Sequence, residues 1–166
     1  MPQYIATPHT AAGAVVDIAP ATGLKTVLQV GVPAATNITL MGWGISIAGT
    51  VASDVPFYAY LMSGDVAATG GTSLTPDQFN DDGMQSSLCV GGTGATSYSA
   101  AYTEGTITTS RFFDSQRVHP QTGYSVWFPS DARPTVGLVA SARYVRVRVN
   151  AVTAAYNVVP WITWNE

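Results

Sequence analysis

The clearest alternation of apolar and polar positions lies in residues 144–152, which have the sequence YVRVRVNAV. Successive side chains of a β-strand point to opposite faces of its sheet, so this period of two predicts a strand with one buried face. The predicted buried face carries Val145, Val147, Val149 and Ala151. The predicted outer face carries Tyr144, Arg146, Arg148 and Asn150. The segment YNVVPWITWN at residues 156–165 predicts a further strand close behind.

Other runs predict more strands, beginning with residues 25–31. Residues 37–47 predict a long strand in which a β-bulge near Met41 and Gly42 reconciles two apolar phases. Residues 55–62 are apolar or aromatic on both faces, so this strand needs a cover on each side, either the chain's own loops or another chain. Shorter strands are predicted at residues 86–90, in a hairpin-like pair within 97–113, at Val118, and at residues 124–128 and 135–139.

Turn residues separate these runs, and only residues 65–68 suggest as much as one helical turn. Eight to ten short strands without a convincing helix predict an all-β fold, an antiparallel β-sandwich. The strand number favours a jelly roll over a seven-stranded immunoglobulin-like sandwich. Residues 25–166 are expected to form this single domain, since 166 residues suffice for one core.

Residues 1–24 are expected to form an extended N-terminal arm, because several prolines and glycines disfavour a regular element there. Two alternatives stay open: a disordered tail, or an arm that crosses a neighbouring subunit. Apolar residues favour an ordered arm and are candidate interface residues: Tyr4, Ile5, Val15, Val16 and Ile18.

Charge is scarce along the chain. Only 10% of the residues are charged, compared with roughly 25% in an ordinary globular domain. The exterior is therefore expected to be neutral or covered by partner chains, and Lys25 is the single lysine. A formal net charge of -3 disfavours nucleic acid as a partner. No segment resembles an export signal or an apolar membrane span, so no membrane partner is expected either.

Candidate catalytic and metal-binding residues are sparse. His9 and His119 lack the spacing of a metal site, and residues 91–95, GGTGA, predict a turn because no helix or Lys-Ser pair follows them. Cys89 is the single cysteine, which excludes an internal disulfide, and burial is its expected fate. Glu104 has no recognisable partner carboxylate for acid–base work. We expect no catalytic residue, cofactor or metal, and no enzymatic activity.

One segment of the chain is rich in acidic and amide side chains. Asp77 and residues 80–83, NDDG, offer oxygen ligands for calcium, but their order misses the alternating spacing of an EF-hand loop. A solvated turn is the preferred interpretation.

Arginines and tryptophans supply the remaining candidates for an interface. Arg146 and Arg148 stand two apart on one strand face, with Arg143 just before them. They form either a solvated face or an inter-subunit face, and the scarcity of lysine favours the interface. Trp161 and Trp164 either fill the ends of the sandwich or lie at contacts.

Six segments, covering most of the chain after Lys25, form a common pattern of strands and turns: GWGISIAGT (42–50), LMSGDVAATGGT (61–72), GTGATSY (92–98), EGTITTSRFFDSQRVHPQTGYSVWFP (104–129), RYVRVRVNA (143–151) and WITWNE (161–166). This pattern resembles the jelly-roll capsid decoration, or cement, proteins of tailed bacteriophages. The resemblance implies a homotrimer on the outside of an icosahedral head, bound to a different major capsid protein. It also implies synthesis in the bacterial cytoplasm and an N-terminal arm that contacts the shell or a neighbouring subunit.

Three functions are therefore distinguished. The first is a non-enzymatic capsid decoration protein that stabilises a tailed-phage head. The second is a carbohydrate- or host-receptor-binding jelly-roll module of a virion, because tyrosine and tryptophan rings can stack on sugars. A hydrolase ranks third, because no pair of positioned acids and bases is recognisable.

Overall fold

Two antiparallel sheets pack face to face in the computed structural model, which describes residues 1–48, 55–79, 85–137, 139–151 and 156–166. Sheet I contains β1 (Gln3–Ala6), β3 (Asn37–Ala48), β6 (Asp77–Gln78), β9 (Tyr124–Trp127), β10 (Thr135–Gly137) and β12 (Asn157–Asn165). Sheet II contains β2 (Gly23–Val32), β4 (Phe57–Gly64), β5 (Thr72–Ser73), β7 (Ser97–Tyr98), β8 (Ser110–Val118) and β11 (Arg143–Ala151). The described residues contain no helix, so the predicted all-β sandwich is confirmed.

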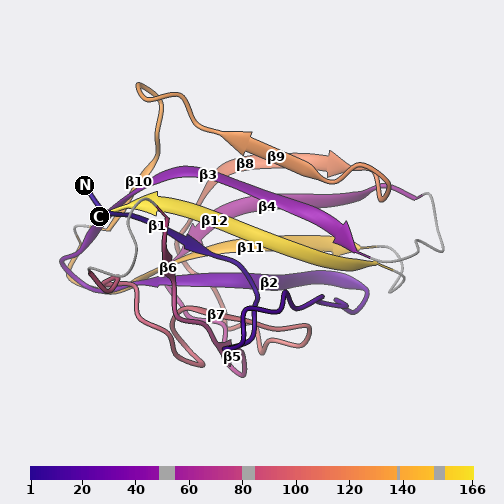
Figure 1. Cartoon of the computed structure of the whole chain (residues 1–166), viewed down its shortest axis with the longest axis horizontal. Coiled ribbons are helices and arrows are strands. Elements are labelled where there is room, and N and C mark those ends of the chain that lie inside the picture. Colours follow the sequence, from indigo (N-terminus) through magenta and orange to yellow (C-terminus); the bar gives the residue numbers. More distant parts are fainter. Residues whose placement is uncertain (49–54, 80–84, 138, 152–155) are drawn as a thin grey trace.

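The strand pairings are those of a jelly roll (Figure 1). Strand β1 pairs with β12, β2 with β11, β3 with β9 and β4 with β8, all antiparallel. The chain is thus a long hairpin whose two arms roll up together, so that its strands fall alternately into the two sheets. Twelve strands are described, more than the eight to ten predicted, because β5, β6 and β7 have only two residues each.

The predicted bulge in the long strand is confirmed at Met41. Gly42 pairs with Thr163 and Leu40 pairs with Trp164, which leaves Met41 as the extra residue of β3. The bulge changes which face each side chain occupies, so Leu40 and Trp43 both point into the core. As a consequence, Gly42 and Gly44 lie on the outer face of sheet I.

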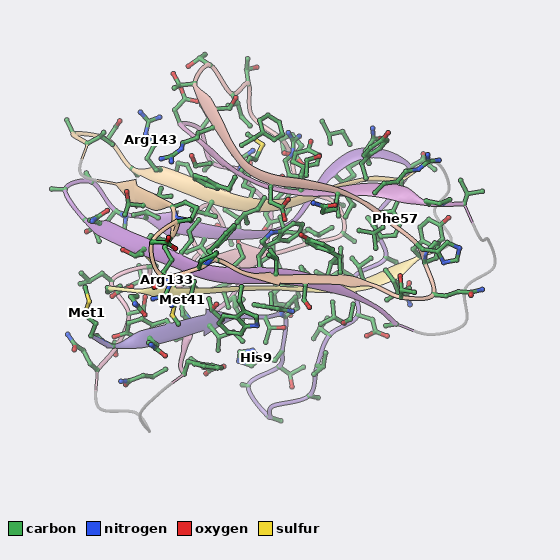
Figure 2. The ribbon with its side chains drawn as sticks, turned by 90° about the horizontal axis from the view of Figure 1, so that it is seen from above. Met1, His9, Met41, Phe57, Arg133 and Arg143 are labelled. Carbon is green, nitrogen blue, oxygen red and sulfur yellow. The ribbon has the colours of Figure 1, made fainter. Side chains whose placement is uncertain are left out.

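The core lies between the sheets and is filled by the alternating apolar positions that the sequence predicts (Figure 2). Val145, Val147 and Val149 of β11 are fully buried there. Large rings close the core, notably Trp43 of β3 and Trp164 of β12. Burial of such apolar surface stabilises the fold by about 25 cal/mol per Å².

Part of the predicted N-terminal arm belongs to the domain itself. Residues 3–6 form β1, which pairs with β12 on one side and β6 on the other. Further along, Ile18 forms an isolated bridge with Val158, and Val15 bridges to His9. Residues 3–6 and Ile18 of the predicted extended arm therefore pair with β12 of the same chain.

Three local predictions in the turn-rich middle of the chain are also wrong. Residues 86–90 form no strand, and residues 65–68 form no helical turn. Within 97–113, β7 pairs with β2 and β5, whereas β8 pairs with β4, so the two are not a hairpin. The physical reason is that these residues find other hydrogen-bond partners: Val66 and Ala68 bond to Arg146 and Gln29 of sheet II, and Ser87 and Leu88 bond to the Glu166 carboxylate.

Candidate functional site

A buried polar cluster attaches residues 65–69 and 102–108 to the outer face of sheet II, and Arg146 is its centre. The two stretches also pair with each other, through Thr69 and Thr103, and we call them the covering stretches. Arg146 and Gln29 are register partners on β11 and β2, and Arg146 Nε donates to Gln29 Oε1 at 3.1 Å. The guanidinium also donates to the carbonyl of Val66 and to Glu104 Oε2, the latter at 3.4 Å. Arg146 is 0% exposed, so it lies neither in solvent nor at an interface, and both predicted alternatives are wrong.

Glu104, in the second covering stretch, completes this cluster. Its carboxylate accepts hydrogen bonds from the backbone N–H and the hydroxyl of Thr26, and it lies 3.4 Å from Arg148 Nη2. Gln29 adds bonds to the backbone of Ala68 at 2.8 and 3.3 Å. Burial lowers the pKa of the Arg146 guanidinium, and the adjacent Glu104 carboxylate opposes this effect. The cluster therefore serves the fold and leaves no free acid–base pair.

Asp65 connects the two covering stretches. Its carboxylate accepts hydrogen bonds from the Thr108 side chain and from the Thr108 N–H, the latter at 3.0 Å, and these bonds lower the pKa of Asp65 to about 2. We expect Thr108→Val to raise this pKa toward the ordinary value near 3.8, as measured by NMR titration of the carboxyl carbon. Because the pKa is depressed, the stabilisation is present above the ordinary value and is lost as the pH falls through about 2. A normal Asp65 pKa in the unmodified chain would contradict this contact.

The outer face of sheet I carries an exposed aromatic surface. The register places Trp127 of β9 beside Gly42 and Trp161 of β12 beside Gly44, all on the outer face. A Cβ atom at Gly44 would lie 2.5 Å from Trp161 Nε1, and one at Gly42 would lie 3.1 Å from Trp127 Cε3. The two indoles therefore lie directly against the backbone of β3, where only glycine leaves room.

Phe79, which follows β6, extends this surface. Its ring centroid lies 6.3 Å from that of Trp127, and the Trp127 and Trp161 rings are 5.5 Å apart with an interplanar angle of 39°. Together with Ile5, Thr7 and Thr163, these three rings line a shallow cavity of about 210 Å³ that contains no charged side chain. Phe79 and Trp127 are each about half exposed. We call Ile5, Phe79, Trp127 and Trp161 the aromatic face.

The predicted interface residues divide into two groups. Ile5 and Trp161 lie on the aromatic face, Val15 is exposed, and Val16, Arg143 and Arg148 are partly exposed. The prediction is wrong for the others, which are buried in the chain's own core or cluster: Tyr4, Ile18, Arg146 and Trp164. Tyr4 and Trp164 pack on each other across β1 and β12, with ring centroids 6.0 Å apart. Sequence reasoning did not name Phe79, whose neighbours come from distant segments.

Outside the Arg146 cluster, the ionisable groups of the described residues are scattered. His9 Nδ1 lies 2.8 Å from the Thr7 carbonyl, its Nε2 lies 3.5 Å from Asp77, and His119 accepts a bond from the Gln121 N–H. Within the described ranges no three His, Cys, Asp or Glu residues converge as metal ligands. Residues 80–83 of the calcium candidate lie outside the described part. Residues 92–95 form the predicted turn, closed by a 3.0 Å bond from Ala95 N to Gly92 O.

Cys89 is buried, as the sequence predicts. Burial, and secondarily the Glu166 carboxylate, raises the pKa of its thiol, so the reactive thiolate is strongly disfavoured. We expect iodoacetamide to leave the native chain unmodified at pH 8 and to alkylate it rapidly in urea, as measured by mass spectrometry. Rapid alkylation of the native chain would show that this thiol is accessible and contradict its placement.

These features define a class of protein: a jelly-roll β-sandwich with one outer face covered by its own loops and an aromatic surface exposed on the other. No helix in the described ranges is long and apolar enough to cross a membrane. Comparisons with protein-family models, curated proteins and solved structures found no match to this chain.

Proposed function

We propose that this chain is a non-enzymatic virion structural protein, a capsid decoration protein that binds the outside of a tailed-phage head as a homotrimer and stabilises it. The observation that carries the proposal is the aromatic face, which offers an uncharged contact surface on a rigid sheet. Aromatic residues are enriched at the centres of protein interfaces, where they supply most of the binding energy. The trimer and the major capsid protein as partner follow from the family resemblance described above.

The rest of the described surface supports this proposal. Besides Phe79 and Trp127, nine large apolar side chains of the described residues are exposed, between Met1 and Val139. A standard protein contact covers about 1,600 Å², and apolar burial contributes about 25 cal/mol per Å² before the costs of association. A contact of ordinary size, repeated over a shell, therefore stabilises it substantially.

The proposal is tested by adding the purified chain to phage heads that lack it. We expect regularly spaced density on the outer surface by electron cryomicroscopy, and heads that withstand higher temperature than undecorated ones. Light scattering of the free chain is expected to give the mass of three copies. Absence of binding to heads, or binding only at the tail, would overturn the proposal.

A second candidate function is carbohydrate binding, and the glycine-backed indoles favour it. Flat aromatic rings with a neighbouring hydrogen-bond donor suit the apolar face and hydroxyl groups of a sugar ring. Among the described residues, no hydrogen bond donated by Nε1 of Trp127 or Trp161 is found. A glycan array that shows one reproducible ligand, lost in Trp161→Ala, would favour this function over capsid decoration.

A further inference from the structure

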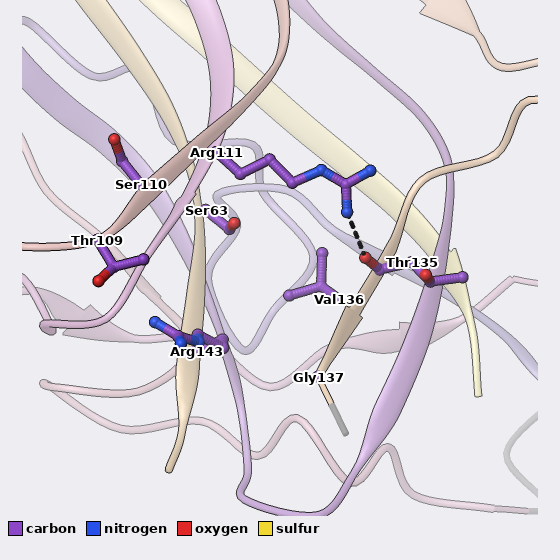
Figure 3. A pocket seen from close by; sticks show the side chains of 8 residues that line it. All are labelled: Ser63, Thr109, Ser110, Arg111, Thr135, Val136, Gly137 and Arg143. Carbon is purple, nitrogen blue, oxygen red and sulfur yellow. Dashed lines mark hydrogen bonds between the residues drawn. The ribbon is translucent and has the colours of Figure 1, made fainter. Parts of the chain in front are cut away.

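Two arginines line a small cavity at one end of the sandwich, near the Arg143 that Figure 2 labels (Figure 3). Its volume is about 200 Å³, and its walls come from both sheets. Sheet II contributes Ser63, Ser110, Arg111 and Arg143, and sheet I contributes residues 135–137 of β10. Figure 3 shows Arg111 and Arg143 on two sides of the cavity with Ser63 between them.

The guanidinium of Arg111 is held in place by neutral partners. Its Nη1 donates to the Thr135 carbonyl at 3.3 Å, and its Cζ lies 5.1 Å from the centroid of the Phe113 ring. One hydrogen bond leaves most of the five N–H donors of this side chain unused. The guanidinium therefore keeps donors for a group inside the cavity.

Neither arginine of the cavity has an acidic partner among the described residues. The ion pairs found there involve His9, Arg146 and Arg148, and none involves Arg111 or Arg143. The nearest acidic residues along the chain have other partners: Asp114, three residues after Arg111, accepts hydrogen bonds from Trp43 and Tyr124, and Asp65, two residues after Ser63, binds Thr108. Two like charges that face one cavity repel each other, and an anion between them converts this repulsion into attraction.

We propose that this cavity binds a compact oxyanion, a phosphate, sulfate or carboxylate group. Guanidinium groups recognise all three through paired charge-assisted hydrogen bonds. Ser63 is 8% exposed and its hydroxyl faces the cavity, so it adds a neutral donor beside the two cations (Figure 3). The volume is below the roughly 300–1,000 Å³ of pockets for drug-sized ligands, which fits a small anion or the end of an acidic side chain. This inference does not rest on the proposed function.

The test is an NMR titration of the Arg Nε–Hε signals with inorganic phosphate, at an ionic strength held constant with sodium chloride. We expect saturable shifts for Arg111 and Arg143, and an affinity at least about tenfold weaker in Arg143→Gln. Arg117→Gln, which removes an exposed charge outside the cavity, is the matched control. The variant Arg143→Lys keeps the charge but lacks the planar fork, and we expect intermediate binding.

Parallel titrations with sulfate and acetate distinguish the source of the oxyanion. Saturation by phosphate and sulfate alone supports a free tetrahedral anion, and saturation by acetate supports the carboxylate of an acidic side chain. Shifts that do not saturate, or an unchanged affinity in a folded Arg143→Gln, would overturn the proposal.

Discussion

Replacing Arg146 by alanine is expected to lower the free energy of unfolding by about 3–5 kcal/mol, the cost typical of breaking a buried ion pair from one side. The substitution leaves the Val66 carbonyl and Gln29 Oε1 without their guanidinium donor, and it leaves Glu104 with Arg148 as its cationic partner. It also empties the space of a fully buried side chain. The measurement is urea unfolding followed by tryptophan fluorescence.

Two further variants show where this energy arises. Arg117→Ala removes an exposed arginine and is expected to change stability by less than about 0.5 kcal/mol. The double variant Arg146→Ala with Glu104→Gln is expected to cost less than the sum of the single changes, because the two groups interact directly. A loss below about 1 kcal/mol for Arg146→Ala would show that the cluster does not hold residues 65–69 and 102–108 on sheet II.

The alternation of apolar and polar residues predicted the sandwich, because each strand's alternation can be recognised from neighbouring residues alone. The bulge at Met41 was predictable for the same reason, since Leu40 and Trp43 change phase within one strand. Strands of two residues carry no alternation: β6 and β7 form on the edges of the longer strands β1 and β2, and β5 forms on β7. Local patterns in the sequence therefore could not predict these three strands.

The placement of Arg146 shows a different limit. Its alternation with valines predicted an outer face correctly, but an outer face is solvated only if no loop covers it. The cover is residues 65–69 and 102–108, which contact Arg146 through the Val66 carbonyl and through Glu104, 42 positions away in the chain. Residues so far apart cannot be paired by periodicity, so the exposure of this arginine was predicted wrongly.

The aromatic face was partly visible in the sequence. Trp161 was named as a contact residue, and the segment GWG at residues 42–44 places two glycines on the face opposite Trp43. Such a pair marks a strand where other backbone or rings approach closely. The contribution of Phe79 depends on the pairing of β6 with β1, which only the structure reveals.

The second large effect is expected at this aromatic face. Trp127→Ala and Trp161→Ala are each expected to weaken binding of the chain to phage heads at least about 30-fold, the loss typical of a central aromatic contact residue. Phe112→Ala removes another exposed ring, from β8 on the other sheet, and is the matched control. Binding is measured by co-sedimentation with heads at increasing concentrations of the chain.

Gly44→Ala tests whether binding depends on where the Trp161 ring lies or only on the presence of the ring. The new Cβ would lie 2.5 Å from Trp161 Nε1, so the indole must move away from β3 although no aromatic group is removed. If the contact requires the flat arrangement, this variant weakens binding as Trp161→Ala does, whereas a contact that needs only apolar area tolerates it. Unchanged binding in Trp127→Ala, Trp161→Ala and Phe112→Ala would show that the chain contacts the heads through another surface. Glycan binding would then be the function to test at the aromatic face.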